Sequence, residues 1–380
     1  MPVTVRPARS YREVGAFIDL PFRLHAGTPW VPPLKLERRI FLSRRRRLGT
    51  YASRVDFELF VAERDGRVVG RVSSHVDHAY NRHHDERRGW FGFFECEDDD
   101  EAARALLDAA EGWLAARGLT VMSGPADFTM NDESGIVIEG HDLAPMVRQP
   151  WHPPYYQRLL EHADAGLEKE VDLFMWELEI SDREQMLPIL PELAAESREK
   201  HNVSIRRMSR RHLRRDLDIF AEIYNRAWRR NFGFVPYDEA DLDQYGLELQ
   251  LVFDRDWFMI AQVEDEPIAI AITIPDINQV LRKMNGRLLP FGWWHYLRRA
   301  KIMNKVRVGF LGVKPKFQHT GAAAALYVEH FDTSAAHPRI KGGEMGWILE
   351  TNRAMNRGME AMHGRIVKKY RVYRRDLTID

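Results

Sequence analysis

The segment from Gln318 to Ala323 has the residue types and spacing of an anion-binding turn. It follows an apolar run, 306–313, that predicts a buried strand, and it opens a run of small residues, 320–336, that predicts a helix. The first amides of a helix lack partners within the helix and lie at the positive end of its dipole. Glycine at 321 removes a Cβ where a phosphate would approach the backbone. The segment suits a pyrophosphate bound by N–H groups; the alternative is an ordinary strand-to-helix turn with an alanine-rich packing face.

The spacing Gln318-x-x-Gly321-x-Ala323 resembles the acyl-CoA loop of the GNAT acyltransferases, which reads Gln/Arg-x-x-Gly-x-Gly/Ala. The segment follows a strand and opens a helix, and strand, helix and strand follow it, in the order that this family has. The resemblance implies acetyl-CoA or another acyl-CoA as co-substrate, and no metal. The implied cofactor-binding residues are Phe310, Leu311, Gly312 and Val313 for pantetheine, Gln318, His319, Thr320, Gly321, Ala322 and Ala323 for pyrophosphate, and Asn352 at the start of the fourth helix.

The reaction implied by the resemblance is transfer of an acyl group, acetyl by default, to a primary amine by direct attack. The amine enters through a wedge between the fourth and fifth strands of the family's fold. An amine must be neutral to attack a thioester, so a general base assists, and an acid can protonate the leaving thiolate. Glu350, at the end of the predicted strand 343–350, is the candidate base. Alternatively, the Glu350 carboxylate only stabilises the start of the helix that follows it.

The family usually places the acid, a tyrosine, four residues before a glycine that ends the fourth helix. Counting back from Gly364, this sequence has Glu360 at that position. Tyr370 and Tyr373, on the predicted last strand 369–377, are therefore the candidate acids. The alternative is that both tyrosines only pack on the two faces of that strand.

The segment between Asp276 and Val306 is rich in aromatic and cationic side chains, which include Phe291, Trp293, Trp294, Tyr296, Arg298, Arg299 and Lys301. Three interpretations stay open. The segment is a lid over an apolar acceptor or acyl chain, or a helix that makes a weak membrane-surface contact through 286–301, or a helical insertion that packs on the other domain.

The chain repeats itself at an offset of about 200 residues. Val3–Arg6 resembles Val203–Arg206, the predicted hairpin from Phe57 resembles that from Trp257, and 155–178 resembles 354–377. We therefore predict a degenerate GNAT-like domain at 1–178, a helical connector at 179–202 and an acyl-CoA-binding GNAT domain at 203–380.

The first copy lacks the glycine motif. After its strand it reads Glu95-Cys96-Glu97-Asp98-Asp99-Asp100-Glu101. These acids would repel a pyrophosphate, although they suit the start of a helix. We therefore expect the cofactor in the second copy.

Strands and helices alternate in both copies, which predicts an α/β (α+β layered) fold. The resemblance refines this to two tandem GNAT-like domains, each with a mixed, mostly antiparallel sheet flanked by helices. The predicted elements of the second copy include a helix within 211–228, where apolar residues recur at helical spacing.

The composition bears on which partners the protein binds and on which cellular compartment it occupies. The 380 residues include 56 Lys+Arg and 56 Asp+Glu, so charge gives no reason to expect nucleic acid. The single cysteine, Cys96, permits neither an internal disulfide nor a Cys-based zinc site. No apolar run approaches the ~18 residues of a membrane span, and the N-terminus does not read as a signal peptide. The sequence therefore predicts a cytoplasmic protein.

Two other functions remain open alongside N-acyl transfer. The first is an aminoacyl-tRNA-dependent transferase of related tandem fold. The second is a non-catalytic acyl-CoA sensor or interaction protein, because the family's fourth-helix tyrosine is missing. The expected partner of an acyltransferase is a small-molecule or peptide amine, whose identity the sequence does not give.

Overall fold

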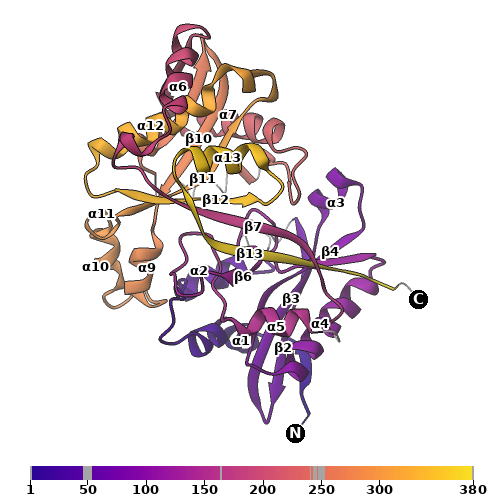
Figure 1. The fold of residues 1–380 in the computed structure, drawn as a ribbon. Coiled ribbons are helices and arrows are strands. Elements are labelled where there is room, and N and C mark those ends of the chain that lie inside the picture. The colour runs from indigo at the N-terminus through magenta and orange to yellow at the C-terminus, as the bar shows by residue number, and fades with distance from the viewer. Residues whose placement is uncertain are drawn as a thin grey trace. The chain divides into compact units, whose positions relative to one another are not determined.

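A computed structural model of the chain describes residues 2–45, 54–162, 165–239, 241–242, 246 and 253–378 (Figure 1). Helices and strands alternate along it, and the strands form mixed sheets, which confirms the predicted α/β class. Two compact units are present. Unit 1 comprises Met1–Leu173, Leu281–Leu297 and Lys368–Asp380, and unit 2 comprises Phe174–Val280 and Arg298–Val367.

Unit 1 is built on a sheet whose strands are antiparallel except for the pair β4–β5. The strand order is β1 (Thr4–Pro7), β2 (Val55–Arg64), β3 (Arg67–Asp77), β4 (Arg88–Cys96), β5 (Val121–Gly124) and then β13 (Arg365–Asp376), with β6 (Ile136–Glu139) also paired to β13. The helices are α1 (Tyr11–Leu24), α2 (Lys35–Phe41), α3 (His78–His84), α4 (Asp100–Ala115) and α5 (Tyr155–Glu161).

The two faces of the unit 1 sheet carry separate cores, because side chains alternate along a strand. On β2, Phe60 and Ala62 pack with α4 and α5, whereas Leu59 and Val61 pack with α1. Helix α1 starts at a capping box in which Ser10 and Glu13 satisfy each other's backbone N–H groups. Helices therefore cover both faces of the sheet.

Unit 2 repeats this plan with one parallel pair, β11–β12. Its strand order is β7 (Glu168–Glu179, from Phe174 onward), β12 (Gly342–Leu349), β11 (Lys305–Val313), β10 (Glu266–Pro275), β9 (Phe258–Val263) and β8 (Val203–Arg207). Its helices are α6 (Ile189–Glu199), α7 (Leu213–Ala227), α11 (Arg299–Ile302), α12 (Ala322–Ala336) and α13 (Arg353–Ala361). Helix α9 (Asn278–Met284) starts in unit 2 and ends in unit 1, and α10 (Gly292–Leu297) lies in unit 1.

The elements predicted in the second half are confirmed to within four residues at their ends. The predicted strands 306–313, 343–350 and 369–377 are β11, β12 and β13, and the predicted helices are α7, α12 and α13. Both predicted hairpins are present, β2–β3 and β9–β10. Their turns place Asp65 (φ 55°) and Glu264 (φ 53°) in the left-handed region, which aspartate tolerates better than most residues do.

The last strand has a placement that the sequence does not reveal. From Lys368 onward β13 belongs to unit 1, where Tyr373–Asp376 pair antiparallel with Gly124–Val121 of β5. Conversely, β7 comes from the first half of the chain, and its part from Phe174 lies beside β12 in unit 2. The predicted domain boundaries, after residue 178 and before residue 203, concern the two copies of the sequence repeat and stay a prediction.

Candidate functional site

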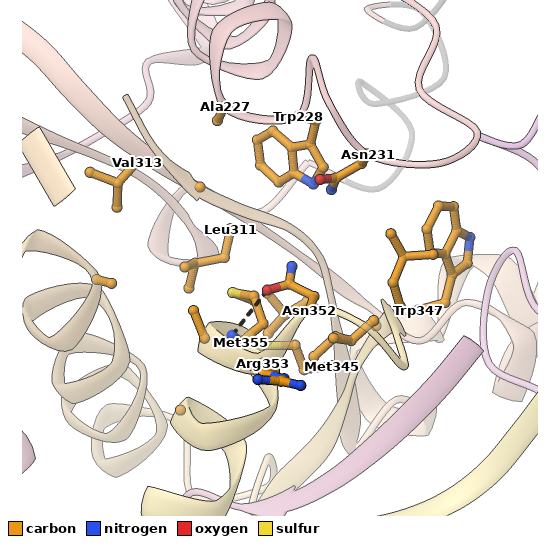
Figure 2. Close-up of a pocket in the computed structure, with 18 of the residues that line it drawn as sticks. Ala227, Trp228, Asn231, Leu311, Val313, Met345, Trp347, Asn352, Arg353 and Met355 are labelled. Carbon is orange, nitrogen blue, oxygen red and sulfur yellow. Dashed lines mark hydrogen bonds between the residues drawn. The ribbon is translucent and has the colours of Figure 1, made fainter. Parts of the chain in front are cut away.

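A cavity of about 650 Å³ lies in unit 2, a size typical of small-molecule sites. Strands β11 and β12 form its walls, and the end of α7, the loop after it and the first turns of α12 and α13 complete it. Figure 2 shows Trp228 and Asn231 on the opposite side of the cavity from Asn352 and Met355.

The cavity exists because β11 and β12 part from each other. Their parallel pairing covers only Lys305–Val308 with Gly342–Met345, whereas β11 stays paired with β10 as far as Val313. On β10 the neighbouring residues Ile272 and Thr273 pair with Phe310 and Val308 of β11. Gly309 lies between these two and has no partner on β10, so it forms a β-bulge. Such a bulge bends a strand and ends its regular pairing. The edge of β11 from Gly309 to Val313 is thus available to an extended ligand.

Two side chains fix the shape of this opening. Arg307 Nη2 donates to the carbonyl oxygen of Gly346 (2.9 Å), where the strands begin to part. Trp228 lies flat against β11, because a Cβ at Gly312 would be 2.2 Å from the indole Cη2. A glycine at 312 is therefore required by the close approach of the Trp228 ring, which forms one wall of the cavity.

The N-terminus of α12 opens beside this cavity. Its first turn follows a short 3-10 helix, Pro315–Thr320, and its N-cap, Gly321, provides no side chain to bond the free amides. Gln318 and Ala323 both line the cavity, as do the exposed Arg230 and Arg353. Free helix amides with two nearby guanidinium groups make an environment suited to a phosphorylated ligand.

The structure brings six of the eleven predicted cofactor residues to the cavity lining: Leu311, Gly312, Val313, Gln318, Ala323 and Asn352. Phe310 instead packs its ring against Phe220 and Tyr224 of α7. His319 is exposed next to His201, and Ala322 and Thr320 are buried, with Thr320 Oγ1 donating to Phe317 O (2.7 Å). Phe310, His319, Thr320, Gly321 and Ala322 are thus not among the lining residues.

Gly321 is needed for a different reason from the predicted one. Its φ of 72° is in the left-handed region, and a Cβ there would lie 2.8 Å from the carbonyl oxygen of Leu193 and 3.2 Å from Ser197 Cβ. Both neighbours belong to α6. The close approach that excludes a side chain at 321 is therefore that of the connector helix, and Ala323 is the small residue of this turn that faces the cavity.

Glu350, the predicted base, is half-buried directly after β12. It precedes Thr351 and Asn352, which line the cavity, but it is not itself a lining residue. Asn352 is the N-cap of α13, and its Oδ1 accepts from Met355 N at 3.2 Å (Figure 2). The role of Glu350 stays a prediction.

Tyr370 and Tyr373, the predicted acids, are buried in the part of β13 that belongs to unit 1. The Tyr370 hydroxyl lies 3.5 Å from Gln149 Oε1, and the Tyr373 hydroxyl donates to Glu161 Oε1 at 2.9 Å. Burial and then Glu161 raise the pKa of Tyr373 well above its usual value. Neither tyrosine is among the residues that line the cavity of unit 2. These contacts agree with the alternative interpretation, in which both tyrosines only pack on the faces of the last strand.

Tyr327 of α12 is a lining residue that the sequence reasoning missed. It is 5% exposed, and its hydroxyl lies 3.6 Å from Met355 Sδ and close to Gly358 of α13. Burial raises its pKa, so the phenol stays protonated. A signal existed, because residues four apart share one helix face and Tyr327 is four residues after Ala323.

The acidic loop of the first copy serves the structure of unit 1. Asp99 is the N-cap of α4, with its side chain accepting from Ala102 N, as expected for acids at a helix start. Glu95, near the end of β4, is buried; its carboxylate is hydrogen-bonded to His25 Nε2 (2.6 Å) and accepts from the Tyr156 hydroxyl (2.7 Å). Burial alone would raise the pKa of Glu95, but His25 lowers it to about 2.

In unit 1 the place that corresponds to the cavity is filled by the chain itself. Pairing of β4 with β5 ends at Trp90 and Ser123, and beyond it Ala126 N donates to Phe91 O (2.9 Å). A Cβ at Gly92 would be only 2.0 Å from Ala126 O. This filling is consistent with a cofactor site in the second copy.

Among the described residues, no three His, Cys, Asp or Glu side chains are grouped so that they could hold a metal ion. Within the same part of the chain, no helix combines the length and the apolar character needed to cross a bilayer.

The sequence matches no protein-family model, but two curated proteins are similar to it along nearly their whole length. Protein YghO of Escherichia coli is 33% identical over 379 residues, 98% of this chain and 95% of that protein. A bacterial ceramide synthase of Caulobacter vibrioides is 31% identical over 382 residues, 99% of this chain and 98% of that protein.

Solved structures share the fold at low sequence identity. A tandem GNAT protein from the clavulanic acid biosynthesis pathway superposes with a TM-score of 0.58 at 12% identity, covering 99% of both chains. A GCN5-related N-acetyltransferase from Sphaerobacter thermophilus has a TM-score of 0.54 at 12% identity, covering 99% of this chain and 96% of the other. At these identities the likeness concerns the fold, and it confirms the predicted tandem architecture.

Proposed function

This chain belongs to the GNAT superfamily as a tandem member, and on that premise we propose that it is an acyl-CoA-dependent N-acyltransferase whose active site is the cavity of unit 2. The observation that carries the proposal is the parting of β11 from β12 directly beside the uncapped N-terminus of α12. The parted strands suit an extended chain of amide groups, and the N-terminus of α12 suits a pyrophosphate. Acyl-CoA contains both groups.

The residues present fit such a co-substrate. The free edge of β11 from Gly309 to Val313 would bind the amide groups of pantetheine as a neighbouring strand does. The first amides of α12, with Gln318 beside them, would bind the pyrophosphate, and Ala323 leaves room for it. Arg230 and Arg353 would add charge-assisted contacts to phosphate oxygens.

In the proposed reaction, a neutral amine enters between the parted strands and attacks the thioester carbonyl. A C–N bond forms and the C–S bond breaks, so the nitrogen loses a proton and the sulfur gains one. We assign the first proton transfer to Glu350, directly or through water. We assign the second to the Tyr327 phenol, which lines the cavity and which burial keeps protonated. The products are an amide and the free thiol.

The acyl group and the acceptor extend beyond the acetyl group and small amine expected by default. Ceramide is the amide of a fatty acid with a long-chain amino alcohol, and a relative 31% identical over 99% of this chain is named a bacterial ceramide synthase. The cavity also offers apolar walls at Leu311, Val313, Met345 and Ile348. We therefore propose a long-chain acyl-CoA as donor and a lipid amine as acceptor.

The proposal is tested by calorimetric titration of acetyl-CoA and palmitoyl-CoA into the parent chain and into Ala323→Asp. An acid at this position suits a helix N-terminus, so the fold is retained, while its charge repels a pyrophosphate. We expect micromolar binding to the parent and a loss of at least about tenfold in Ala323→Asp, equivalent to ~1.4 kcal/mol.

The matched control is Ala323→Asn, which has the same shape without the charge and should bind within about threefold of the parent. Thiol release in the presence of a long-chain amino alcohol then measures turnover. Absence of acyl-CoA binding by the parent, or equal binding by Ala323→Asp, would overturn the site. Binding without turnover on any amine would instead favour a non-catalytic acyl-CoA sensor.

A further inference from the structure

One short segment of unit 1 displays most of its large apolar side chains to solvent. Between residues 288 and 297, six such side chains are 42–75% exposed: Leu288, Leu289, Phe291, Trp293, Trp294 and Leu297. A concentration of this kind marks an interaction surface, whereas apolar residues scattered singly on a surface need no explanation. We name residues 288–297 the aromatic segment.

The aromatic segment is held in place at its base. Met284 is 5% exposed, and Gly286, at φ 74°, lies so close to Phe22 that a Cβ would be 2.3 Å from the ring. The carbonyl oxygen of Gly286 also accepts from Lys35 N (3.2 Å). These contacts agree with the predicted insertion packing on the first copy, but they involve only residues that precede the segment.

Hydrogen bonds within the exposed part close it into a turn. Trp293 N donates to Leu288 O (2.9 Å), Trp294 N donates to Phe291 O (3.1 Å), and Trp293 Nε1 donates to Pro290 O (2.7 Å). The chain thus forms a compact turn that internal hydrogen bonds close, with its large apolar side chains exposed. A surface that enters a lipid headgroup region needs both properties, because unsatisfied backbone groups are costly there.

The charged residues that flank the aromatic segment in the chain all have one sign. The sequence has no acidic residue between Asp276 and Glu329, although the whole chain has as many acids as bases. Arg282, Lys283 and Arg287 precede the segment and are exposed, and Arg298, Arg299 and Lys301 follow it in the chain. The surface therefore fits an anionic partner.

We propose that the aromatic segment docks on the surface of an anionic phospholipid bilayer, with its apolar side chains in the headgroup region and the flanking cations on lipid phosphates. Tryptophan is enriched at that depth of a membrane, and basic residues next to apolar ones bind anionic leaflets. Docking on a second copy would oppose two surfaces of the same charge. A nucleic acid would use the cations and rings but not Leu288, Leu289 and Leu297.

This proposal stands on the surface alone and does not depend on the cavity of unit 2. It is tested by sedimentation of the full chain with vesicles of phosphatidylcholine containing 30% phosphatidylglycerol, a composition chosen at roughly the charge of an anionic leaflet. We expect the chain to sediment with these vesicles. Partitioning should fall at least about tenfold on pure phosphatidylcholine or in ~1 M salt, where charges are screened beyond ~3 Å.

The side chains are tested by the triple variant Leu289→Ser, Phe291→Ser, Trp294→Ser. Burial of each of these side chains is worth roughly tenfold in partitioning, so binding should fall below detection. Because all three are exposed, the melting curve should match that of the parent. The matched control is Tyr11→Ser with Leu36→Ser, two exposed apolar residues elsewhere in unit 1, which should bind as the parent does.

A second measurement locates the contact. Brominated lipids quench tryptophan at the membrane surface, so they should quench the parent but not Trp293→Phe with Trp294→Phe. No sedimentation of the parent with anionic vesicles would overturn the proposal. It would also be overturned if the triple variant bound vesicles normally, or if its only effect were to abolish self-association or binding to a single-stranded oligonucleotide.

Discussion

Tyr327 combines two properties of a proton donor: it lines the cavity, and burial holds its pKa above the ordinary value of a phenol. The direction of the shift matters, since a group that protonates a thiolate must itself be protonated at the working pH. At the scale of single residues, the proposed chemistry depends on this hydroxyl and on the carboxylate of Glu350.

We predict that Tyr327→Phe lowers kcat about a hundredfold, the usual order for losing a general acid, without changing the Kd for acyl-CoA. The change removes only the hydroxyl, whose nearest partner is Met355 Sδ at 3.6 Å, so stability should be retained. Thiol release measures kcat and calorimetry measures Kd. In the parent, kcat should not decline between pH 8 and 10 through loss of this donor, because its pKa is raised.

The control for Tyr327 is Tyr237→Phe, which removes the hydroxyl from a ring packed against Phe220 in the same unit and should leave kcat unchanged. If Tyr327→Phe kept full turnover, the proton would come from another group or from water. The sequence could predict the motif residues Gln318 and Ala323, and helical spacing places Tyr327 on the same face of α12 as Ala323. It could not predict that this face lies against the cavity, because that depends on how α12 packs on α13.

At the scale of elements, α12 is fixed to the sheet by a buried histidine. His330 Nδ1 donates to Leu326 O within α12 (2.6 Å), which leaves Nε2 to accept from Thr273 Oγ1 of β10 (2.7 Å). His330 is 4% exposed, and burial lowers its pKa from 6.5 to about 4. The helix whose N-terminus forms the proposed phosphate site is thus anchored through a neutral imidazole.

This pKa sets the direction of a pH effect on stability. The folded state disfavours the charged imidazole, so between pH 6.5 and 4 the unfolded chain binds more protons. The contribution of His330 to the free energy of unfolding is complete above pH 6.5, and about 3 kcal/mol is lost as the pH falls to 4. We predict that His330→Gln has a flatter dependence of unfolding free energy on pH in this window, by up to ~1.4 kcal/mol per pH unit.

Urea unfolding at several pH values between 4 and 7 measures this difference. The control is His212→Gln at an exposed histidine, whose curve should run parallel to that of the parent. Parallel curves for His330→Gln and the parent would show that His330 is not held neutral in the folded state.

Much of the element order follows from periodicity and turn residues, and the cavity does not. The apolar run 306–313 and the small residues from Ala322 correctly predict β11 and α12. The parting of β11 from β12 depends on a bulge at Gly309. A bulge is a property of pairing between strands that lie far apart in the sequence, so no local pattern reveals it.

At the scale of the whole molecule, the two units exchange strands. The half-chains that the repeat delimits are therefore not the compact units, because β13 completes the sheet of unit 1. Its side chains serve that unit too: Arg371 pairs with Asp172 (2.8 Å), and Lys368 Nζ donates to Gln149 Oε1 (3.1 Å). The sequence predicts the strand correctly but not its partner, since the apolar pattern of a strand does not specify which edge it joins.

We predict that truncation after Val367 unfolds part of unit 1, because β5 and β6 lose the strand that pairs with both. Hydrogen exchange should show amide protection in β5 and β6 falling at least about tenfold, since exchange follows the free energy of local opening. The control is truncation after Leu377, which spares β13 and should leave both strands protected. Unchanged protection after the longer truncation would show that β5 and β6 do not depend on β13.

The strand exchange also sets an order of events on the ribosome. About 250 residues separate β5 from the part of β13 that pairs with it. At ~5–20 residues per second, the nascent chain takes roughly 10 to 50 seconds to make that partner after β5 has been synthesised. Throughout this interval the growing polypeptide carries an open strand edge, which is a template for aggregation. Chaperones that shield such edges should therefore matter more for the yield of this protein than for one whose domains each close on their own residues.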